Sequence, residues 1–96
     1  MSIRTCQNNV AKTLKEIADL EKKSSDETKK EVSKSKDIDR IKRSITSSIS
    51  SSTFNSKQQQ ILRLADDIAN IHKKKADYSK KIADKTTQLN RYREAL

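Results

Sequence analysis

Glycine and proline are both absent from the 96-residue sequence, and aromatic residues are limited to Phe54, Tyr78 and Tyr92. Tight turns and positive φ angles rely on glycine and proline, so a domain rich in sheets or loops is hard to build without them. A glycine-rich phosphate loop is excluded for the same reason. With 31% hydrophobic residues, the chain also has few side chains for a globular core. These absences predict an all-α fold that buries little surface per residue.

Cysteine and long apolar runs are also scarce. Cys6 is the only cysteine, so no internal disulfide can form and nothing indicates a secreted, disulfide-rich scaffold. No apolar run approaches the roughly 20 residues of a membrane span. The first ten residues are polar and lack the apolar stretch of a signal peptide. We therefore expect a cytoplasmic protein that does not contact membranes.

A stripe of mostly apolar residues runs through the second half of the sequence in steps of three and four. This spacing, which averages about 3.5 residues, keeps one side of an α-helix facing one partner along its length. A single helix cannot bury such a stripe, so we expect it to contact another helix. The stripe consists of Ile61, Leu64, Ile68, Ile71, Lys75, Tyr78, Ile82, Lys85, Leu89, Tyr92 and Leu96.

Serine and threonine dominate residues 47–56 and interrupt the helical pattern. Their hydroxyl groups compete for backbone hydrogen bonds and favour caps and turns over helix interiors. We therefore predict an elbow at about residues 49–54. One helix is expected over about residues 3–48 and a second over about residues 55–96.

Several elbow residues are suited to begin the second helix. Ser52, Thr53 or Asn55 is expected to be its N-cap, and Gln58 stands three residues after Asn55, as a capping-box partner would. Phe54, just outside the predicted helix, is expected to pack across the bend as a hydrophobic staple. These signals support a sharp reversal of the chain at this point.

Two helices of equal length around a short elbow predict a long antiparallel two-helix hairpin, a coiled coil that forms a single domain over residues 1–96. A register in which paired residue numbers sum to about 102 brings the apolar residues of both helices together. It pairs Ile41 with Ile61, Ile38 with Leu64, Leu14 with Leu89 and Val10 with Tyr92.

The first helix carries a poorer stripe than the second, because polar residues separate its two apolar blocks. We therefore expect the second helix to have more apolar surface than the hairpin covers, and exposed apolar stripes mark interaction sites. A second copy would cover it in a four-helix bundle or a larger stack, and the alternative is a loosely packed middle. The polar inward positions are expected to be Glu21, Ser24, Thr28, Glu31 and Ser35. The contact residues are expected to be Val10, Leu14, Ile17, Ile38, Ile41 and Ile45 on the first helix, and Ile61, Leu64, Ile68, Ile71, Tyr78, Ile82, Leu89 and Tyr92 on the second.

Side chains for catalysis or metal binding are few. His72 is the only histidine, and residues 73–75 beside it are lysines that would repel a cation, so we interpret it as a surface residue. Cys6 is expected near the helix contact as an ordinary small residue, because a catalytic thiol needs a neighbouring base and a pocket. We therefore expect no catalytic residue, no metal site, no cofactor and no enzymatic activity in this chain.

The net charge of +9 is shared by both halves of the chain. A basic chain attracts nucleic acid and other anionic surfaces. The lysine runs at residues 73–75 and 80–81 have no aromatic or arginine neighbours placed for stacking or base reading. A basic hairpin that binds nucleic acid or an anionic surface is therefore the alternative to self-association, and not the preferred interpretation.

Several segments together resemble a known family. They are residues 17–23 (IADLEKK), 26–31 (DETKKE), 41–45 (IKRSI), 52–57 (STFNSK) and 73–85 (KKKADYSKKIADK). Read in order, they resemble the N-terminal coiled-coil region of bacterial TIR-domain proteins, over nearly the whole chain. The serine–threonine elbow between two charged helices is the most distinctive part of the resemblance.

In such proteins this region precedes a TIR domain that cleaves NAD, commonly in antiphage defence. The resemblance implies an oligomerisation, scaffold and regulatory module whose partners are further copies of itself and a C-terminal effector domain in a longer chain. The TIR strands and catalytic glutamate have no counterpart in these 96 residues, so no catalytic residue is carried over. The last residue, Leu96, stands on the stripe without a helix stop signal, which predicts either a piece of a longer protein or a scaffold retained alone.

Overall fold

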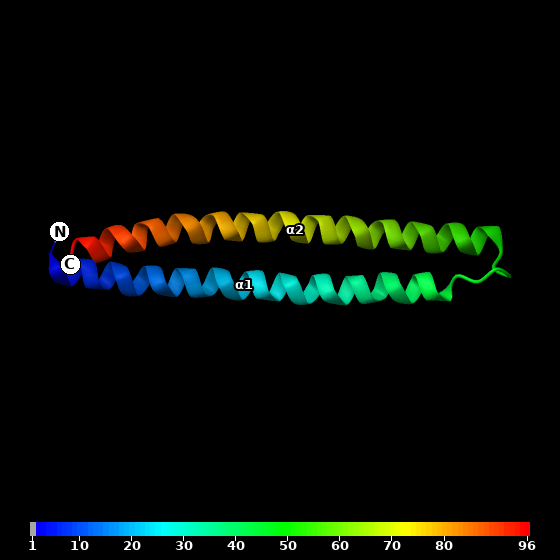
Figure 1. The fold of residues 1–96 in the computed structure, drawn as a ribbon, viewed down its shortest axis with the longest axis horizontal. Helices are drawn as coiled ribbons and strands as arrows, with labels where there is room; N and C mark the ends of the chain where they lie inside the picture. Colours follow the sequence, from blue (N-terminus) through cyan, green and yellow to red (C-terminus); the bar gives the residue numbers. More distant parts are fainter. Residues whose placement is uncertain (1) are drawn as a thin grey trace. The chain divides into compact units, whose positions relative to one another are not determined.

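Two helices make up almost all of the computed structural model, which describes residues 2–96. They are α1 (Ile3–Ser44) and α2 (Ser51–Glu94), joined by a short elbow over residues 45–50 (Figure 1). Residues 2–96 contain no β-strand. The predicted all-α helical hairpin is therefore confirmed. Neither helix is long and apolar enough to cross a bilayer.

Helix α1 begins at a polar cap and ends in a basic turn. The backbone N–H of Thr5 donates to the Ser2 hydroxyl (3.1 Å), and that of Cys6 donates to the Ser2 carbonyl (3.0 Å). The bond to the hydroxyl satisfies a backbone donor that the first turn leaves unpaired, and the bond to the carbonyl is the first hydrogen bond of the helix itself. Lys42 and Arg43 lie in the last turn, where positive charge is favoured by the helix dipole.

The end of α1 differs from the sequence prediction, because the helix stops at Ser44 and not near residue 48. The Ser44 hydroxyl donates to the Ile41 carbonyl (2.6 Å) and accepts from the Lys57 ammonium group (2.6 Å). A serine hydroxyl that takes a backbone acceptor in this way weakens the continuation of a helix. The elbow consequently covers residues 45–50, upstream of the predicted 49–54.

The start of α2 also lies upstream of the predicted position, and its cap is Ser50 rather than Ser52, Thr53 or Asn55. The Ser50 hydroxyl accepts from the Thr53 backbone N–H (3.3 Å) and lies 2.8 Å from the Thr53 hydroxyl. Any serine in this run can cap, so the sequence alone did not select one. Phe54 lies inside α2, four residues after the cap. With Ile49, which is half-buried just before the cap, it occupies the two positions of a hydrophobic staple.

The chain is divided into two units, each built from a stretch of both helices. The elbow unit comprises Glu27–Lys73, and the terminal unit comprises the described residues up to Asp26 together with Lys74–Leu96. Within each unit an α1 segment lies beside an α2 segment (Figure 1). Each unit therefore has its own helix–helix contact.

Polar contacts between the helices define the register within each unit. In four such pairs the two residue numbers sum to between 101 and 103, which agrees with the predicted sum of about 102. The pairs are Ser44 with Lys57, Lys34 with Asp67 and Glu31 with His72 in the elbow unit, and Glu16 with Lys85 in the terminal unit.

Candidate functional site

The inward side of α2 is the stripe seen in the sequence. Within α2, the buried and half-buried residues recur without a gap in steps of three and four, and every other residue of this helix is exposed. We call this set the α2 seam: Lys57, Ile61, Leu64, Ile68, Ile71, Lys75, Tyr78, Ile82, Lys85, Leu89 and Tyr92. Leu96, the last residue of the predicted stripe, follows the end of α2 and is exposed.

Burial along the α2 seam is incomplete. Ile71 is only 4% exposed and Leu89 is also buried, whereas the other apolar seam residues are half-buried. The sequence predicted that the hairpin leaves apolar surface of the second helix uncovered, and the structure corrects this expectation at Ile71. The half-buried apolar and tyrosine residues of the α2 seam are Ile61, Leu64, Ile68, Tyr78, Ile82 and Tyr92.

The inward side of α1 follows an equally regular spacing that the sequence did not show. We call it the α1 seam: Cys6, Val10, Thr13, Ile17, Leu20, Ser24, Glu27, Glu31, Lys34, Ile38 and Ile41, with Ile45 continuing the spacing just beyond the helix. Of the expected contact residues, Val10, Ile17, Ile38, Ile41 and Ile45 are half-buried at these positions.

Leu14 is a correction to the predicted contacts. Its side chain is 43% exposed, whereas the neighbouring Thr13 is 4% exposed. Positions 13 and 14 both fit steps of three and four between Val10 and Ile17, and in the packed hairpin Thr13 is the one that turns inward, so the larger leucine lies beside the seam. The middle of the helix shifts in the same way: Leu20, Glu27 and Lys34 lie on the seam, whereas Glu21, Thr28 and Ser35 are exposed.

Charged side chains lie within the α1 seam of the elbow unit. Glu27 is buried, and its Oε1 accepts from Lys30 Nζ at 3.3 Å, while its buried Oε2 has no hydrogen-bond partner. Lys34 reaches across to Asp67 at 3.1 Å, and Glu31 pairs with His72. Polar groups at seam positions reduce stability but fix register, because a shifted pairing would leave them without partners.

An ion pair also joins the helices in the terminal unit. Lys85, a seam residue of α2, donates to the Glu16 carboxylate. This hydrogen bond lowers the pKa of Glu16, partial desolvation opposes the shift, and the positive charges of Lys85 and Lys12 add to the lowering. The lysine stem is half-buried while its charged end reaches the edge of the contact.

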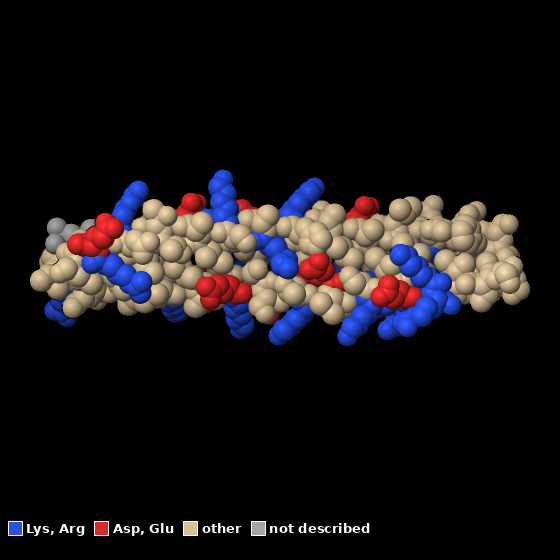
Figure 2. Space-filling model, in the orientation of Figure 1, with Lys and Arg blue, Asp and Glu red and all other residues tan. Residues whose placement is uncertain are grey.

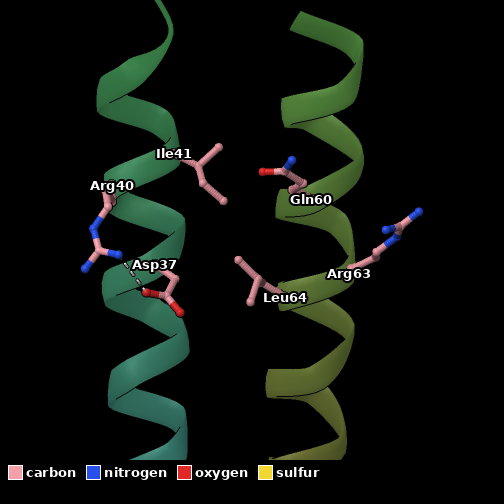
Figure 3. Close-up of a pocket in the computed structure, with 6 residues that line it drawn as sticks. All are labelled: Asp37, Arg40, Ile41, Gln60, Arg63 and Leu64. Atoms are coloured by element: carbon pink, nitrogen blue, oxygen red, sulfur yellow. Dashed lines mark ion pairs between the residues drawn. The ribbon is translucent and has the colours of Figure 1, made fainter. Parts of the chain in front are cut away.

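A charged groove runs along one side of the helix contact in the elbow unit. It is lined by Asp37, Arg40 and Ile41 of α1 and by Gln60, Arg63 and Leu64 of α2 (Figure 3). Ile41 and Leu64 point toward one another at its floor, while Asp37 and Arg40 pair at 3.4 Å on its α1 wall. The polar lining residues immediately precede seam residues in the sequence, so they share one side of their helices.

The terminal unit has a groove of the same kind. It is lined by Glu16, Asp19, Leu20, Lys23, Lys81 and Lys85. Except for the seam residues Leu20 and Lys85, these residues again precede seam positions. We call the residues that precede seam positions the charged face of each unit. Figure 2 shows charged side chains along both helices. Residues 44–56, which comprise the elbow and the helix ends beside it, contain no charged residue.

Residues that immediately follow seam positions lie on the opposite side, which we call the low-charge face of each unit. In the elbow unit this face has only two charged residues, Asp39 and Lys42, against five on the charged face. In the terminal unit it again has two, Glu21 and Arg93, against ten. The low-charge residues are Thr28, Val32, Ser35, Gln58, Leu62, Ala65, Ala69 and His72 in the elbow unit, and Gln7, Ala11, Leu14, Ala18, Ser25, Ala76, Ser79, Ala83, Thr86 and Asn90 in the terminal unit.

The two faces also differ in exposure. Beside the α1 seam, Asn9, Glu16 and Asp37 are half-buried, and all three belong to the charged face. Every residue of the low-charge face is exposed, in both units. Sequence reasoning missed this asymmetry because it depends on the identity of the α1 seam. The positions next to the continuous α2 stripe, with Ala65, Ala69, Ala76 and Ala83 on one side, were the available signal.

His72 and Cys6, the only histidine and the only cysteine, occupy different environments. His72 has an exposed side chain, as expected of a surface residue, and it pairs with Glu31. Cys6 is fully buried on the α1 seam. Among residues 2–96, no group of three or more His, Cys, Asp or Glu side chains is placed to hold a metal ion.

Comparison of the chain with protein-family models, curated proteins and solved structures gives no match. The resemblance to TIR-associated coiled coils therefore stays a prediction based on the sequence segments quoted above. The helix seams and the two faces are the features from which a function can be argued.

Proposed function

We propose that this hairpin is an assembly module that associates with further copies of itself. The observation that supports this most is the incomplete burial of the α2 seam. Six of its apolar or tyrosine residues remain half-buried inside the hairpin. Each is oriented toward α1 yet keeps part of its surface in water, because two helices leave their contact open along both sides.

The energetic argument follows from that remaining surface. Complete burial of an isoleucine or leucine side chain contributes roughly 1.5–3 kcal/mol, and a half-buried one realises only part of this. Two helices form a thin core, which is marginal for a small domain. A second hairpin packed against the first would cover one open side of the seam and extend the core, as in a four-helix bundle.

The proposed role in a longer protein follows the resemblance to TIR-associated coiled coils. The module would set how many copies of a C-terminal, NAD-hydrolysing effector come together in the cytoplasm, and it would contribute no catalytic residue. An NAD-consumption assay on this chain is expected to show no turnover above a buffer control. Turnover that depends on the chain would contradict the scaffold assignment.

Assembly itself is tested by the molar mass of the chain in solution. Sedimentation equilibrium over a wide concentration range is expected to give a mass that rises from 11.0 kDa to a multiple of it. Apolar contacts resist screening, so the assembly is expected to persist at about 1 M salt, where the Debye length is near 3 Å. A mass of 11.0 kDa at every concentration would contradict the proposal.

A second candidate function is binding of an anionic polymer or surface. On α1, exposed basic residues recur every seven residues at Lys15, Lys22, Lys29, Lys36 and Arg43. Within the elbow unit, Lys29, Lys36 and Arg43 therefore form a basic ridge with about 10.5 Å between successive charges on a regular helix. A gel shift with duplex DNA at two salt concentrations tests it, since phosphate contacts weaken steeply as salt rises.

A further inference from the structure

We propose that a second copy of the hairpin docks on the low-charge face of the elbow unit. The two copies would be related by a two-fold axis in the plane of the interface, crossing the helices near Leu62. This inference rests on the proposed assembly function and specifies the surface that performs it. It places α1 of one copy antiparallel on α1 of the other, and α2 likewise on α2.

Exposed aliphatic side chains mark this face. Leu62 is 62% exposed and Val32 is 48% exposed, and both immediately follow seam residues, so they lie on the same side of the helix contact. Ala65 and Ala69 continue the face along α2. Small side chains allow the backbones of packed helices to approach closely, and the larger aliphatic groups supply apolar area.

Charge favours a second copy as the occupant. Two chains of net charge +9 repel one another, and surfaces rich in unpaired lysine would keep them apart. The low-charge face is the side on which this repulsion is smallest. Its two charged residues, Asp39 and Lys42, also carry opposite signs.

Those two charges are self-complementary under a two-fold axis. In a two-fold (isologous) interface, each contact occurs twice: if residue i of one copy contacts residue j of the other, residue j of the first copy also contacts residue i of the second. An axis midway between Asp39 and Lys42 brings Asp39 of each copy beside Lys42 of the other. In the observed register, Leu62 lies at the level of residue 40, so the same axis brings the two Leu62 side chains together.

A second copy would need to cover only a small share of the accessible surface of the chain. A standard protein–protein interface buries about 800 Å² on each partner, which is about a ninth of the 7079 Å² accessible surface of the chain. The low-charge face of the terminal unit shows the same pattern, with exposed Leu14 flanked by Ala11 and Ala18. Each unit therefore offers a face of the same chemistry to its counterpart.

The experiment compares Leu62→Lys with Asn70→Lys by sedimentation equilibrium of the full chain. Both substitutions add one positive charge to exposed positions of α2 in the elbow unit, but Asn70 belongs to the charged face. Leu62→Lys is expected to weaken association at least about tenfold, because it places two lysines at the axis. Asn70→Lys is expected to change it by less than about threefold. Far-UV circular dichroism should show equal helix content.

Charge reversal tests the two-fold arrangement independently. Asp39→Lys alone and Lys42→Asp alone are each expected to weaken association at low salt by several-fold. The double variant restores opposite charges across the axis and should recover to within about threefold of the parent. Equal weakening by Leu62→Lys and Asn70→Lys would overturn the docking face. A double variant that associates no more tightly than the more weakly associating single variant would also overturn it. In both cases the assembly of the parent chain would still stand. A parent chain that is monomeric throughout would overturn both proposals.

Discussion

The two helices of the hairpin bury very different side chains on the sides that face one another. Eight of the eleven α2 seam positions are isoleucine, leucine or tyrosine, and the other three are lysine. The α1 seam has only six apolar residues among eleven, and its middle holds Ser24, Glu27, Glu31 and Lys34. Yet both seams keep the same spacing without a break. A regular inward side therefore does not require an apolar residue at every position.

The difference shows how the two helices share their tasks. Helix α2 supplies most of the apolar area, whereas α1 contributes apolar residues mainly in two blocks near its ends. The residues between these blocks that face α2 are placed there by the helical spacing, whatever their polarity. Buried polar groups at these positions oppose stability but penalise a shifted register.

The largest expected effect on the free energy of unfolding comes from a substitution in the apolar α2 seam. Ile71→Asp places a carboxylate at a position that is almost fully buried, which should cost more than about 3 kcal/mol in the free energy of unfolding. Urea denaturation followed by circular dichroism at low protein concentration measures it. Asn70→Asp adds the same charge at the neighbouring exposed residue and should cost less than about 0.5 kcal/mol. Similar losses in both variants would show that the α2 seam does not carry the fold.

A smaller effect is expected from the α1 seam, where the structure and the sequence prediction disagree. Thr13→Asp should cost about 2 kcal/mol, because a charge replaces a buried hydroxyl. Leu14→Asp, at the adjacent exposed position, should cost less than about 1 kcal/mol at concentrations where the chain is monomeric. A larger loss of stability for Leu14→Asp than for Thr13→Asp would indicate that Leu14, and not Thr13, faces α2. The inward positions of α1 would then differ by one residue from those described above.

The buried polar middle of α1 gives a prediction of opposite sign. Glu27→Leu removes a buried carboxylate with an unpartnered oxygen, so the free energy of unfolding should rise by about 1 kcal/mol. The midpoint of urea unfolding measures this change, with Lys30→Leu as a control for loss of the exposed partner. A destabilisation of similar size would mean that the carboxylate makes a net favourable contribution to the helix pair.

The smallest effect concerns pH and the terminal unit. The folded chain lowers the pKa of Glu16, so the ion pair with Lys85 stabilises the fold above the ordinary carboxyl pKa of 4.5. This contribution is lost as pH falls through the lowered value, because the unfolded chain takes up the proton first. Comparing the thermal midpoints of the parent and Glu16→Gln at neutral and acidic pH should show a gap that closes on acidification. A gap that is independent of pH would contradict the role of the carboxylate charge.

Much of the fold followed from particular residues in the sequence. The absence of glycine and proline, the α2 stripe and the serine-rich elbow predicted the all-α hairpin, and the register was predicted to within one residue. The elbow boundaries shifted because Ser50 and Ser44 compete for caps with several equivalent serines, and only their hydrogen bonds select one set. The α1 seam was missed at Thr13, Leu20, Glu27 and Lys34. The predicted positions 14, 21, 28 and 35 fit the same steps of three and four, so spacing alone could not choose between the two sets.

The sequence by itself determined that there are two helices, roughly where the chain reverses and which side of α2 turns inward, because helix propensity and apolar spacing act locally. Only the tertiary structure decided which side of α1 meets it. That choice depends on the summed packing of α1 against α2, and no single α1 residue reveals it. The separation of charged and low-charge faces follows from the same choice, because a rotation of α1 by one residue would mix them.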